Sequence, residues 1–234
     1  MNNPLTRVVT SRGKEKVWSW SYSKLKNFET CPKRHYNVDV AKTVSEDEES
    51  GALAEGNAVH KVLDQAIGKG VPLPLGREYL QKWVDKMRAP GVEKVLTEQK
   101  FAITEGLAPT EYFGAEAWYR GQADVIRLAG PVALAVDWKT GKILEDGVQL
   151  ALMAQCVFSH HPQVQVIRTE FVWLKEDATT RLDIKRADMV KIWADVLPRV
   201  ARLKAAYLAT EFPPKPNYLC RKHCPVVACP HHGI

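Results

Sequence analysis

The sequence predicts a mixed α/β fold, in which a small mixed β-sheet is flanked by helices. Two β-rich runs, ADVIRL and VALAVDW, are joined by the turn residues Ala129-Gly130-Pro131. Apolar residues recur at helical spacing over residues 52–67 and 187–210, one segment on each side of these runs. Strands enclosed by amphipathic helices indicate one α/β core with helical additions.

Length and composition are those of a soluble globular protein, with 234 residues, of which 45% are hydrophobic and 26% charged. No apolar run approaches the roughly 18 residues of a membrane span, and the N-terminus does not resemble a signal peptide. We therefore expect a cytoplasmic protein without membrane contact. The net charge of +6 suits a polyanionic partner, and the absence of a P-loop argues against an ATP-driven motor.

The N-terminal part of the chain is predicted to be a flexible arm followed by helices. Residues 1–17 are polar and aperiodic, as is typical of an arm. Ser21 or Ser23 is expected to cap the next helix, which Pro32 interrupts. An acidic loop follows over residues 44–50. Two amphipathic helices are then expected, over residues 52–67 and over residues 78–87.

The rest of the chain alternates predicted strands with predicted helices. Besides the two runs above, we expect strands over residues 95–104, 112–120 and 165–175. Helices are expected over residues 143–159 and 187–210, the second of them strained at Pro198. The last 23 or so residues are too short and too rich in proline to form a core of their own.

Two aspartates and a lysine stand out in the predicted hairpin, spaced as Asp124…Asp137-x-Lys139. Because side chains alternate along a strand, Asp137 and Lys139 point to one face and Trp138 points to the other. Two carboxylates from neighbouring strands, with a cation beside them, suit a divalent-metal phosphodiesterase, since Mg²⁺ and Mn²⁺ take carboxylate oxygens. The D-x-K motif alone is weak, and a strand-ending aspartate before a solvated turn also explains it.

The run GQADVI…AVDWKTGK resembles motifs II and III of the PD-(D/E)xK nucleases, in the branch related to the RecB nuclease domain. The resemblance extends to His60, which ends a G-x-x-x-H motif, and to Gln149, which matches the glutamine of a Q-x-x-x-Y helix. Met153 stands where that helix has its tyrosine. The resemblance implies a restriction-endonuclease-like core with an N-terminal helical lobe and a C-terminal cysteine-rich tail.

On this basis we expect a flexible arm and one nuclease domain with three parts. The arm covers residues 1–17 and the domain covers residues 18–234. Within the domain, the helical lobe covers residues 18–90 and the catalytic core covers residues 91–185. The C-terminal helix and its cysteine tail cover residues 186–234.

The resemblance also implies a role for each site residue. His60, Asp124, Asp137 and the backbone carbonyl of Trp138 would hold Mg²⁺ or Mn²⁺. Lys139 would position or activate the attacking water, and Gln149 would orient Lys139, water or a DNA phosphate.

Two further residues allow more than one interpretation. A single histidine on a helix is more often structural than catalytic, and only the resemblance favours His60 as a ligand. Glu98 could support the metal from nearby, but an exposed strand carboxylate is the simpler explanation.

Three of the five cysteines, Cys220, Cys224 and Cys229, lie within ten residues of one another near the C-terminus. In a reducing compartment such a group suggests a metal rather than disulfides. Cys156, within a predicted helix, is most simply a small buried apolar residue.

Cys31 lies in a segment that resembles the S-x-S-x-L…CPxRY opening of RecB-like and CRISPR-associated nucleases. In the iron–sulfur branch of that family, one such cysteine and three C-terminal ones bind a [4Fe–4S] cluster, which implies Cys31, Cys220, Cys224 and Cys229 as ligands. The usual tail spacing is C-x₂-C-x₅-C, whereas here His223 stands at the middle position. Zn²⁺ bound by tail cysteines and histidines, or free cysteines, are the alternatives.

The function that the resemblance implies is a metal-dependent DNA nuclease, an exonuclease acting on DNA ends or single-stranded DNA. The size and tail resemble stand-alone nucleases of phage or CRISPR-associated kind, with recombination or replication proteins as candidate partners. The alternatives are a non-catalytic or partner-dependent DNA-binding subunit that keeps the fold, and a nuclease acting on RNA.

Overall fold

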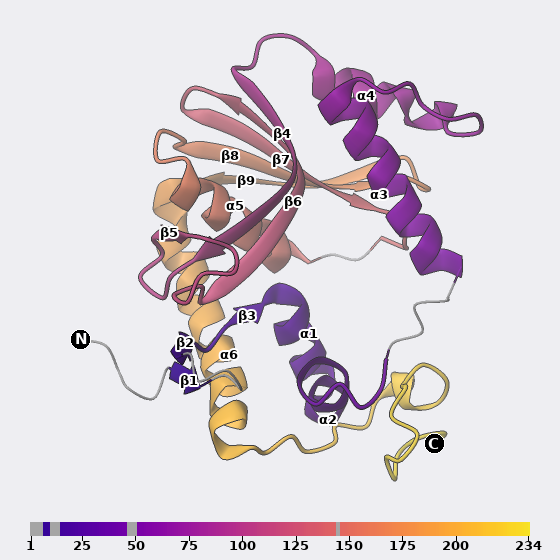
Figure 1. Cartoon of the computed structure of the whole chain (residues 1–234), viewed down its shortest axis with the longest axis vertical. Coiled ribbons are helices and arrows are strands. Elements are labelled where there is room, and N and C mark those ends of the chain that lie inside the picture. The colour runs from indigo at the N-terminus through magenta and orange to yellow at the C-terminus, as the bar shows by residue number, and fades with distance from the viewer. Residues whose placement is uncertain (1–6, 10–14, 46–50, 144–145) are drawn as a thin grey trace. The chain divides into compact units, whose positions relative to one another are not determined.

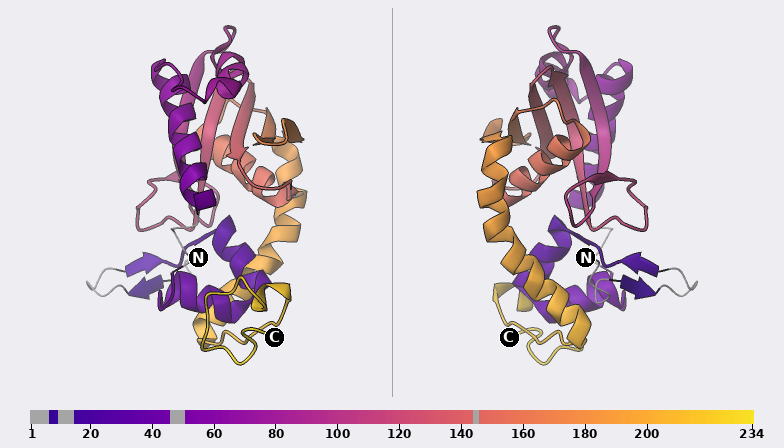
Figure 2. Two further views of the ribbon diagram at one scale, coloured as in Figure 1. Left: turned by 90° about the vertical axis from the view of Figure 1, so that its right-hand side faces the viewer. Right: turned by 90° about the vertical axis from the view of Figure 1, so that its left-hand side faces the viewer.

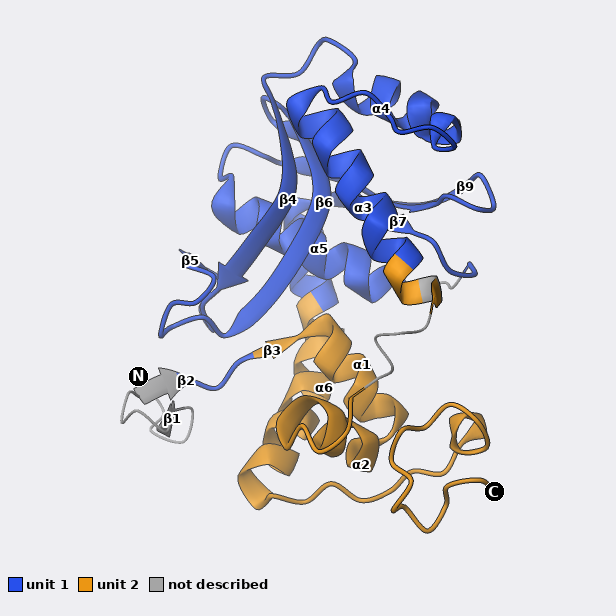
Figure 3. Ribbon diagram, turned by 45° about the vertical axis from the view of Figure 1, so that its right-hand side comes forward, with its two compact units in different colours: residues 1–19, 55–192 blue, residues 20–54, 193–234 orange. Residues whose placement is uncertain are grey.

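The structure is a computed structural model that describes residues 7–9, 15–45, 51–143 and 146–234. The predicted arm lies partly outside this range, and so does most of the predicted acidic loop. The chain forms two units (Figure 3): residues 1–19 with 55–192, and residues 20–54 with 193–234. We call them unit 1 and unit 2. The boundaries fall inside two helices, α3 (Gly51–Lys69) and α6 (Met189–Ala209).

Unit 1 is built on a mixed sheet with the strand order β5-β4-β6-β7-β8-β9 (Figure 1). Neighbouring strands are antiparallel except β7 and β8, which are parallel. Helix α5 (Gly147–His160) lies between β7 and β8 in the chain, as a parallel connection requires. The strands are β4 (Lys94–Ile103), β5 (Pro109–Thr110), β6 (Tyr119–Ala129), β7 (Val132–Lys139), β8 (Val166–Trp173) and β9 (Ala178–Lys185).

Strands β6 and β7 form the predicted hairpin. Ala129 pairs with Val132, which leaves Gly130 and Pro131 as a two-residue turn. Gly130 has φ of +56°, a conformation that glycine adopts without steric cost. The register brings Val125 opposite Val136, and both are buried in the same apolar cluster.

Helices cover both faces of this sheet. Figure 2 shows α3 and α5 on opposite sides of the strands. On one side, α3 and α4 (Gln81–Arg88) pack on Val136, Trp138 and neighbouring strand residues, so that Trp138 lies on the face opposite Asp137 and Lys139, as predicted. On the other side, α5 is buried continuously from Leu150 to Phe158, with Gln155 as the one polar side chain in this run. Cys156 is one of these buried residues, as predicted.

Two strand predictions need correction. Residues 112–118 do not form the expected strand, because turns closed by Gly114 N to Glu111 O and Ala117 N to Gly114 O occupy them. The strand begins only at Tyr119. In addition, β9 was not among the expected strands; exposed residues alternate with more buried ones along most of it, as is typical of a strand at the edge of a sheet.

Arg186, in the short helix η4 (Arg186–Asp188), fixes the C-terminal end of α5. Its guanidinium donates hydrogen bonds to four backbone carbonyls, those of Phe158, His161, Pro162 and Val164. The last carbonyls of a helix have no N–H partners inside the helix, so the Arg186 guanidinium supplies the donors that a further helical turn would have supplied.

We expect Arg186→Ala to lower the free energy of unfolding by about 2–4 kcal/mol, because several half-buried carbonyls lose their donor at once. Chemical denaturation monitored by tryptophan fluorescence measures this change. Arg181→Ala, at an exposed position on β9, is the control and should change stability by less than about 0.5 kcal/mol. Equal stabilities of the two variants would contradict the role given to Arg186.

Unit 2 is helical. Its elements are β3 (Trp20–Ser21), α1 (Tyr22–Thr30), α2 (Pro32–His35), a π-helical turn η2 (Tyr36–Val40), the larger part of α6, and η5 (Tyr218–Cys220). Ser21 caps α1 by accepting a hydrogen bond from the amide of Lys24, in agreement with the first of the two expected caps.

A buried histidine joins α2 to α6 inside unit 2. His35 is fully buried, with Nδ1 2.8 Å from a carboxylate oxygen of Asp39 and Nε2 2.9 Å from the hydroxyl of Tyr207. Both ring nitrogens therefore have partners, as a buried polar side chain requires.

Two strands and one short helix complete the described elements. Strands β1 (Arg7–Val9) and β2 (Glu15–Val17) pair with each other, and η3 (Glu78–Leu80) precedes α4. Among the helices of the described residues, none is both long and apolar enough to traverse a lipid bilayer.

Candidate metal centre

The predicted site residues of unit 1 converge where β6 and β7 separate. The ladder between these strands ends at Val125 and Val136, one residue before Asp124 and Asp137 would pair. The side chain of Asp124 takes the place of the missing ladder bond, since its Oδ2 accepts a hydrogen bond from the backbone N–H of Trp138 at 2.7 Å. Asp124 is only 5% exposed. Its carboxylate is thereby fixed beside the Asp137-Trp138-Lys139 segment.

His60 reaches the same carboxylate from α3. Its Nδ1 lies 3.2 Å from Oδ1 of Asp124, and this hydrogen bond raises the pKa of His60 against the lowering effect of burial. One turn earlier on α3, a Cβ atom on Gly56 would lie only 3.0 Å from Oγ1 of Thr140. The glycine of the G-x-x-x-H motif thus allows the helix to approach the end of β7 closely.

Glu98 also belongs to this group, although the sequence favoured an exposed strand carboxylate. Glu98 is half-buried. The hydrogen-bonded ladder between β4 and β6 is interrupted at Glu98 and Asp124, and Glu98 has a positive φ of +49°. Ligand atoms of His60, Glu98 and Asp124 all lie within 4.8 Å of one another. Burial and the charge of Asp124 raise the pKa of Glu98. The interrupted ladder and the positive φ of Glu98 bring its carboxylate into the metal-binding group, and the sequence pattern does not predict either feature.

Asp137, Lys139 and Gln149 form the other half of the site. The Lys139 ammonium lies 2.5 Å from Oδ2 of Asp137 and 3.4 Å from the side-chain oxygen of Gln149. The amide nitrogen of Gln149 is 3.5 Å from Oδ1 of Asp137. The glutamine, on α5, therefore contacts both charged partners, and Lys139 in addition lies over the ring of Phe171.

The electrostatics of Asp137 fit a site for a cation. Burial raises the pKa of this carboxyl to about 6, because the charged form loses hydration, and the nearby charge of Asp124 adds to the effect against the opposing influence of Lys139. Apart from the lysine ion pair, the buried Oδ2 has no hydrogen-bond partner among the described residues. Two largely buried carboxylates that repel each other are suited to binding Mg²⁺ or Mn²⁺, and the adjacent imidazole of His60 can add a nitrogen ligand. The role of the Trp138 carbonyl stays a prediction.

An open pocket of about 360 Å³ adjoins the group, lined by Asn57, His60, Lys61, Asp64, Glu98 and Gln122. It lies between α3 and the strands β4 and β6. The carboxylate of Glu98 accepts a hydrogen bond from the side chain of Gln122 at 2.6 Å, which connects the metal-binding group to the pocket wall.

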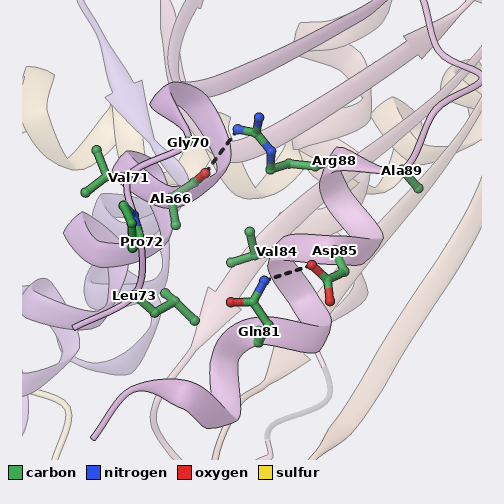
Figure 4. A pocket seen from close by; sticks show the side chains of 10 residues that line it. All are labelled: Ala66, Gly70, Val71, Pro72, Leu73, Gln81, Val84, Asp85, Arg88 and Ala89. Atoms are coloured by element: carbon green, nitrogen blue, oxygen red, sulfur yellow. Dashed lines mark hydrogen bonds between the residues drawn. The ribbon is translucent and has the colours of Figure 1, made fainter. Parts of the chain in front are cut away.

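A second pocket, between the end of α3 and α4, does not resemble a catalytic site. Figure 4 shows its lining, where Arg88 donates to the carbonyl of Ala66 and Gln81 donates to Asp85. Its one carboxylate already has a partner, and the arginine serves to terminate α3, so we assign this pocket no chemical role.

The four cysteines of the predicted cluster lie together in unit 2. Cys31, Cys220, Cys224 and Cys229 line one small cavity, together with His231 and His232. Cys31 follows α1 directly, and the tail returns to this point, since Asn217 donates to the carbonyl of Thr30 and the Lys33 amide donates to that of Pro213. His223, the alternative ligand considered above, is exposed and does not line the cavity.

The fold resembles that of solved structures. A candidate exonuclease from Eubacterium rectale superposes with a TM-score of 0.53 at 14% identity, over 88% of this chain and 86% of that protein. The protein SSO0001 matches with a TM-score of 0.46 at 16% identity, over 92% of this chain and 87% of its own. At such identities the first match demonstrates the fold alone.

Comparison at the level of sequence families is decisive. No curated protein matches the chain. The family model of the PD-(D/E)XK nuclease superfamily matches residues 19–230, nearly the whole chain. This range includes the strands that carry Asp124, Asp137 and Lys139 and the helix that carries His60. The chain therefore belongs to the PD-(D/E)XK nuclease superfamily.

Proposed function

We propose that this protein is a metal-dependent DNA nuclease, an exonuclease that hydrolyses phosphodiester bonds at DNA ends or in single-stranded DNA. One observation carries the proposal. The bond from the Trp138 amide to Asp124 joins the carboxylate that His60 contacts to the Asp137–Lys139 pair, so that all four side chains belong to one site.

The residues divide the work as follows. His60, Asp124 and Asp137 hold Mg²⁺ or Mn²⁺ with the Trp138 carbonyl, and Glu98 is near enough to contribute. The ion, when bound, supplies charge stabilisation at the phosphate. Lys139 orients the attacking water and offsets the negative charge that develops on the phosphate oxygens. Gln149, which contacts both Lys139 and Asp137, keeps these two side chains in position.

Cleavage of labelled DNA tests this proposal. The substrates are a linear single strand, a blunt duplex and a circular single strand, each incubated with Mg²⁺, with Mn²⁺ or with EDTA. We expect metal-dependent shortening of linear DNA, no reaction in EDTA, and survival of the circle. Binding without cleavage under all conditions would favour a non-catalytic DNA-binding subunit instead, and cutting of the circle would contradict the exonuclease assignment.

For unit 2 we propose a [4Fe–4S] cluster held by Cys31, Cys220, Cys224 and Cys229. Backbone amides donate to two of the sulfurs at 3.4 Å, from Lys215 to Cys31 and from Asn217 to Cys220, and such donors stabilise thiolates. The basic side chains of Lys33, Arg34 and Lys215 line the same cavity, and none of its lining residues within the described ranges is acidic. Both features favour a ligand set with negative charge.

The cysteine and histidine ligand atoms described in this cavity are spaced more widely than a single zinc ion requires. Zn–S bonds of about 2.3 Å in a tetrahedral site bring the sulfurs to within about 3.8 Å of one another. Within the described ranges, no three cysteine or histidine ligand atoms of this cavity meet even a 4.8 Å limit.

We expect anaerobically purified protein to be brown and Cys31→Ser to lose the colour and part of the thermal stability, because one ligand of the cluster is removed. Absorbance spectra with iron and zinc analysis measure both. Cys156→Ser, which alters the buried cysteine of α5, is the control and should keep the colour. A colourless protein with one zinc per chain would contradict the cluster.

A further inference from the structure

The region beside the metal centre continues along β4 and β6 to a pair of aromatic residues. Lys100 of β4 pairs with Gln122 of β6, whose side chain is bonded to Glu98. Arg120 lies two residues from Gln122 on the same strand, so it shares the same face. Lys100, Gln122 and Arg120 therefore lead away from the metal-binding group in one direction.

This line of residues ends at Tyr112. The Lys100 ammonium lies 5.9 Å from the centre of the Tyr112 ring, and the Arg120 guanidinium lies 5.8 Å from it. Arg120 also donates to the carbonyl of Tyr112 at 2.6 Å and to the hydroxyl of Ser19 at 2.7 Å. These bonds fix the loop that carries Tyr112 against the strands.

Phe113 is held on the outside of this arrangement. Its ring packs edge-on against that of Tyr112, with the centroids 4.9 Å apart and the planes at 89°. Even so, 76% of the residue is exposed. An apolar ring that is held in place yet faces solvent can stack on a base, since every nucleic acid base has an aromatic face.

We infer that residues Lys61, Lys100, Tyr112, Phe113, Arg120 and Gln122 form a track for single-stranded DNA that leads to the metal centre. The proposal rests on the proposed nuclease function and specifies the surface that receives the strand. The distance from Asp124 to Arg120 along β6 is roughly 13 Å at about 3.3 Å per residue. That length accommodates about four nucleotides stacked at about 3.4 Å each.

The chemistry of the track favours an unpaired strand over a duplex. Stacking on an aromatic ring requires bases that are free of base pairs. Exposed Lys61, which lines the pocket on α3, and exposed Lys100, whose ammonium lies beside the Tyr112 ring, can each meet a phosphate of the strand. The loop also carries Glu105, Glu111 and Glu116, so we expect stacking to contribute more than net charge.

Binding of a fluorescein-labelled oligomer of twelve thymidines, measured by anisotropy without added divalent cations, separates the track from cleavage. We expect Phe113→Ala to raise its Kd about 5- to 100-fold, in line with the stacking energy of one base. Phe113→Trp should retain binding, and the Kd for a blunt hairpin duplex should change less than about twofold. Leu75→Ala, at a side chain that is 98% exposed, is the control and should bind normally.

The two lysines of β4 test the phosphate contact. Lys100→Ala should reduce the slope of log Kd against log salt concentration by about 0.7, the value for one phosphate contact on a single strand. Lys94→Ala, at an exposed position on the same strand, should leave the slope unchanged.

An unchanged Kd in Phe113→Ala, or an equal loss of duplex binding, would overturn the track. The proposed activity fails separately: wild-type protein that binds the oligomer through Phe113 yet cuts no DNA with Mg²⁺ or Mn²⁺ would refute the nuclease and leave the track intact. Conversely, metal-dependent DNA cleavage by the wild-type protein, together with an unchanged Kd of the Phe113→Ala variant, would support the nuclease and refute the track.

Discussion

Asp137→Ala is expected to reduce the rate of Mg²⁺-dependent DNA cleavage by at least about 10³-fold, which corresponds to about 4 kcal/mol of transition-state stabilisation. The substitution removes a charged ligand of the proposed ion and the partner of Lys139. Single-turnover cleavage of an end-labelled oligonucleotide measures the loss. Asp85→Ala, at an exposed aspartate of α4, is the matched control and should cleave at the wild-type rate.

The fold should survive this change. Burial raises the pKa of Asp137 to about 6, above its ordinary value, so the carboxylate, which is ionised at neutral pH, lowers the stability of the folded state there. Removal of that charge should leave the melting temperature unchanged or higher. Wild-type cleavage by the variant would contradict its role, and a collapse of the melting temperature would indicate a structural role instead.

Lys139→Ala is expected to lower the cleavage rate by about 10²- to 10³-fold while the protein still binds Mn²⁺. The lysine acts on water and phosphate in our account, and the ion is held by other side chains. Calorimetric titration with Mn²⁺ tests this separation. Lys142→Ala, an exposed lysine three residues further along, is the control.

The pH of this titration matters. Lys139 lowers the pKa of Asp137, so the pKa of that carboxyl rises further when the lysine is removed, and protons then compete with the metal near neutral pH. At pH 8.5 Asp137 should be ionised in both proteins. If Mn²⁺ affinity still disappears in the variant, the lysine contributes to metal binding and the proposed division of roles is wrong.

Strand alternation predicts which residues of β7 share a face, and the family resemblance selects His60 and Gln149 as their expected neighbours. The faces of β7 follow from its sequence, and Trp138 packs into an apolar cluster with α3 and α4. The predicted helices that carry His60 and Gln149 exist within a few residues of their expected bounds. The structure places His60 beside Asp124, where Gly56 allows α3 to come close, and it places Gln149 beside Asp137.

Features that depend on tertiary geometry could not be predicted in this way. Glu98 joins the metal-binding group because the β4–β6 ladder is interrupted at a residue with positive φ, which no periodic pattern encodes. The loop at residues 112–118 resembles a strand in composition, yet its backbone closes turns around Gly114. Phe113 acquires its exposed position from that loop.

The central claim is that a divalent cation held by these residues acts directly on the scissile phosphate. A single phosphorothioate, placed in each configuration at the linkage cut first, tests it under single-turnover conditions. Sulfur is a poor ligand for hard Mg²⁺ and a better one for Mn²⁺. We predict that one configuration is cut slowly in Mg²⁺ and that Mn²⁺ restores its rate towards that of unmodified DNA. Equal rates in both metals for both configurations, or cleavage that persists in EDTA, would contradict the account.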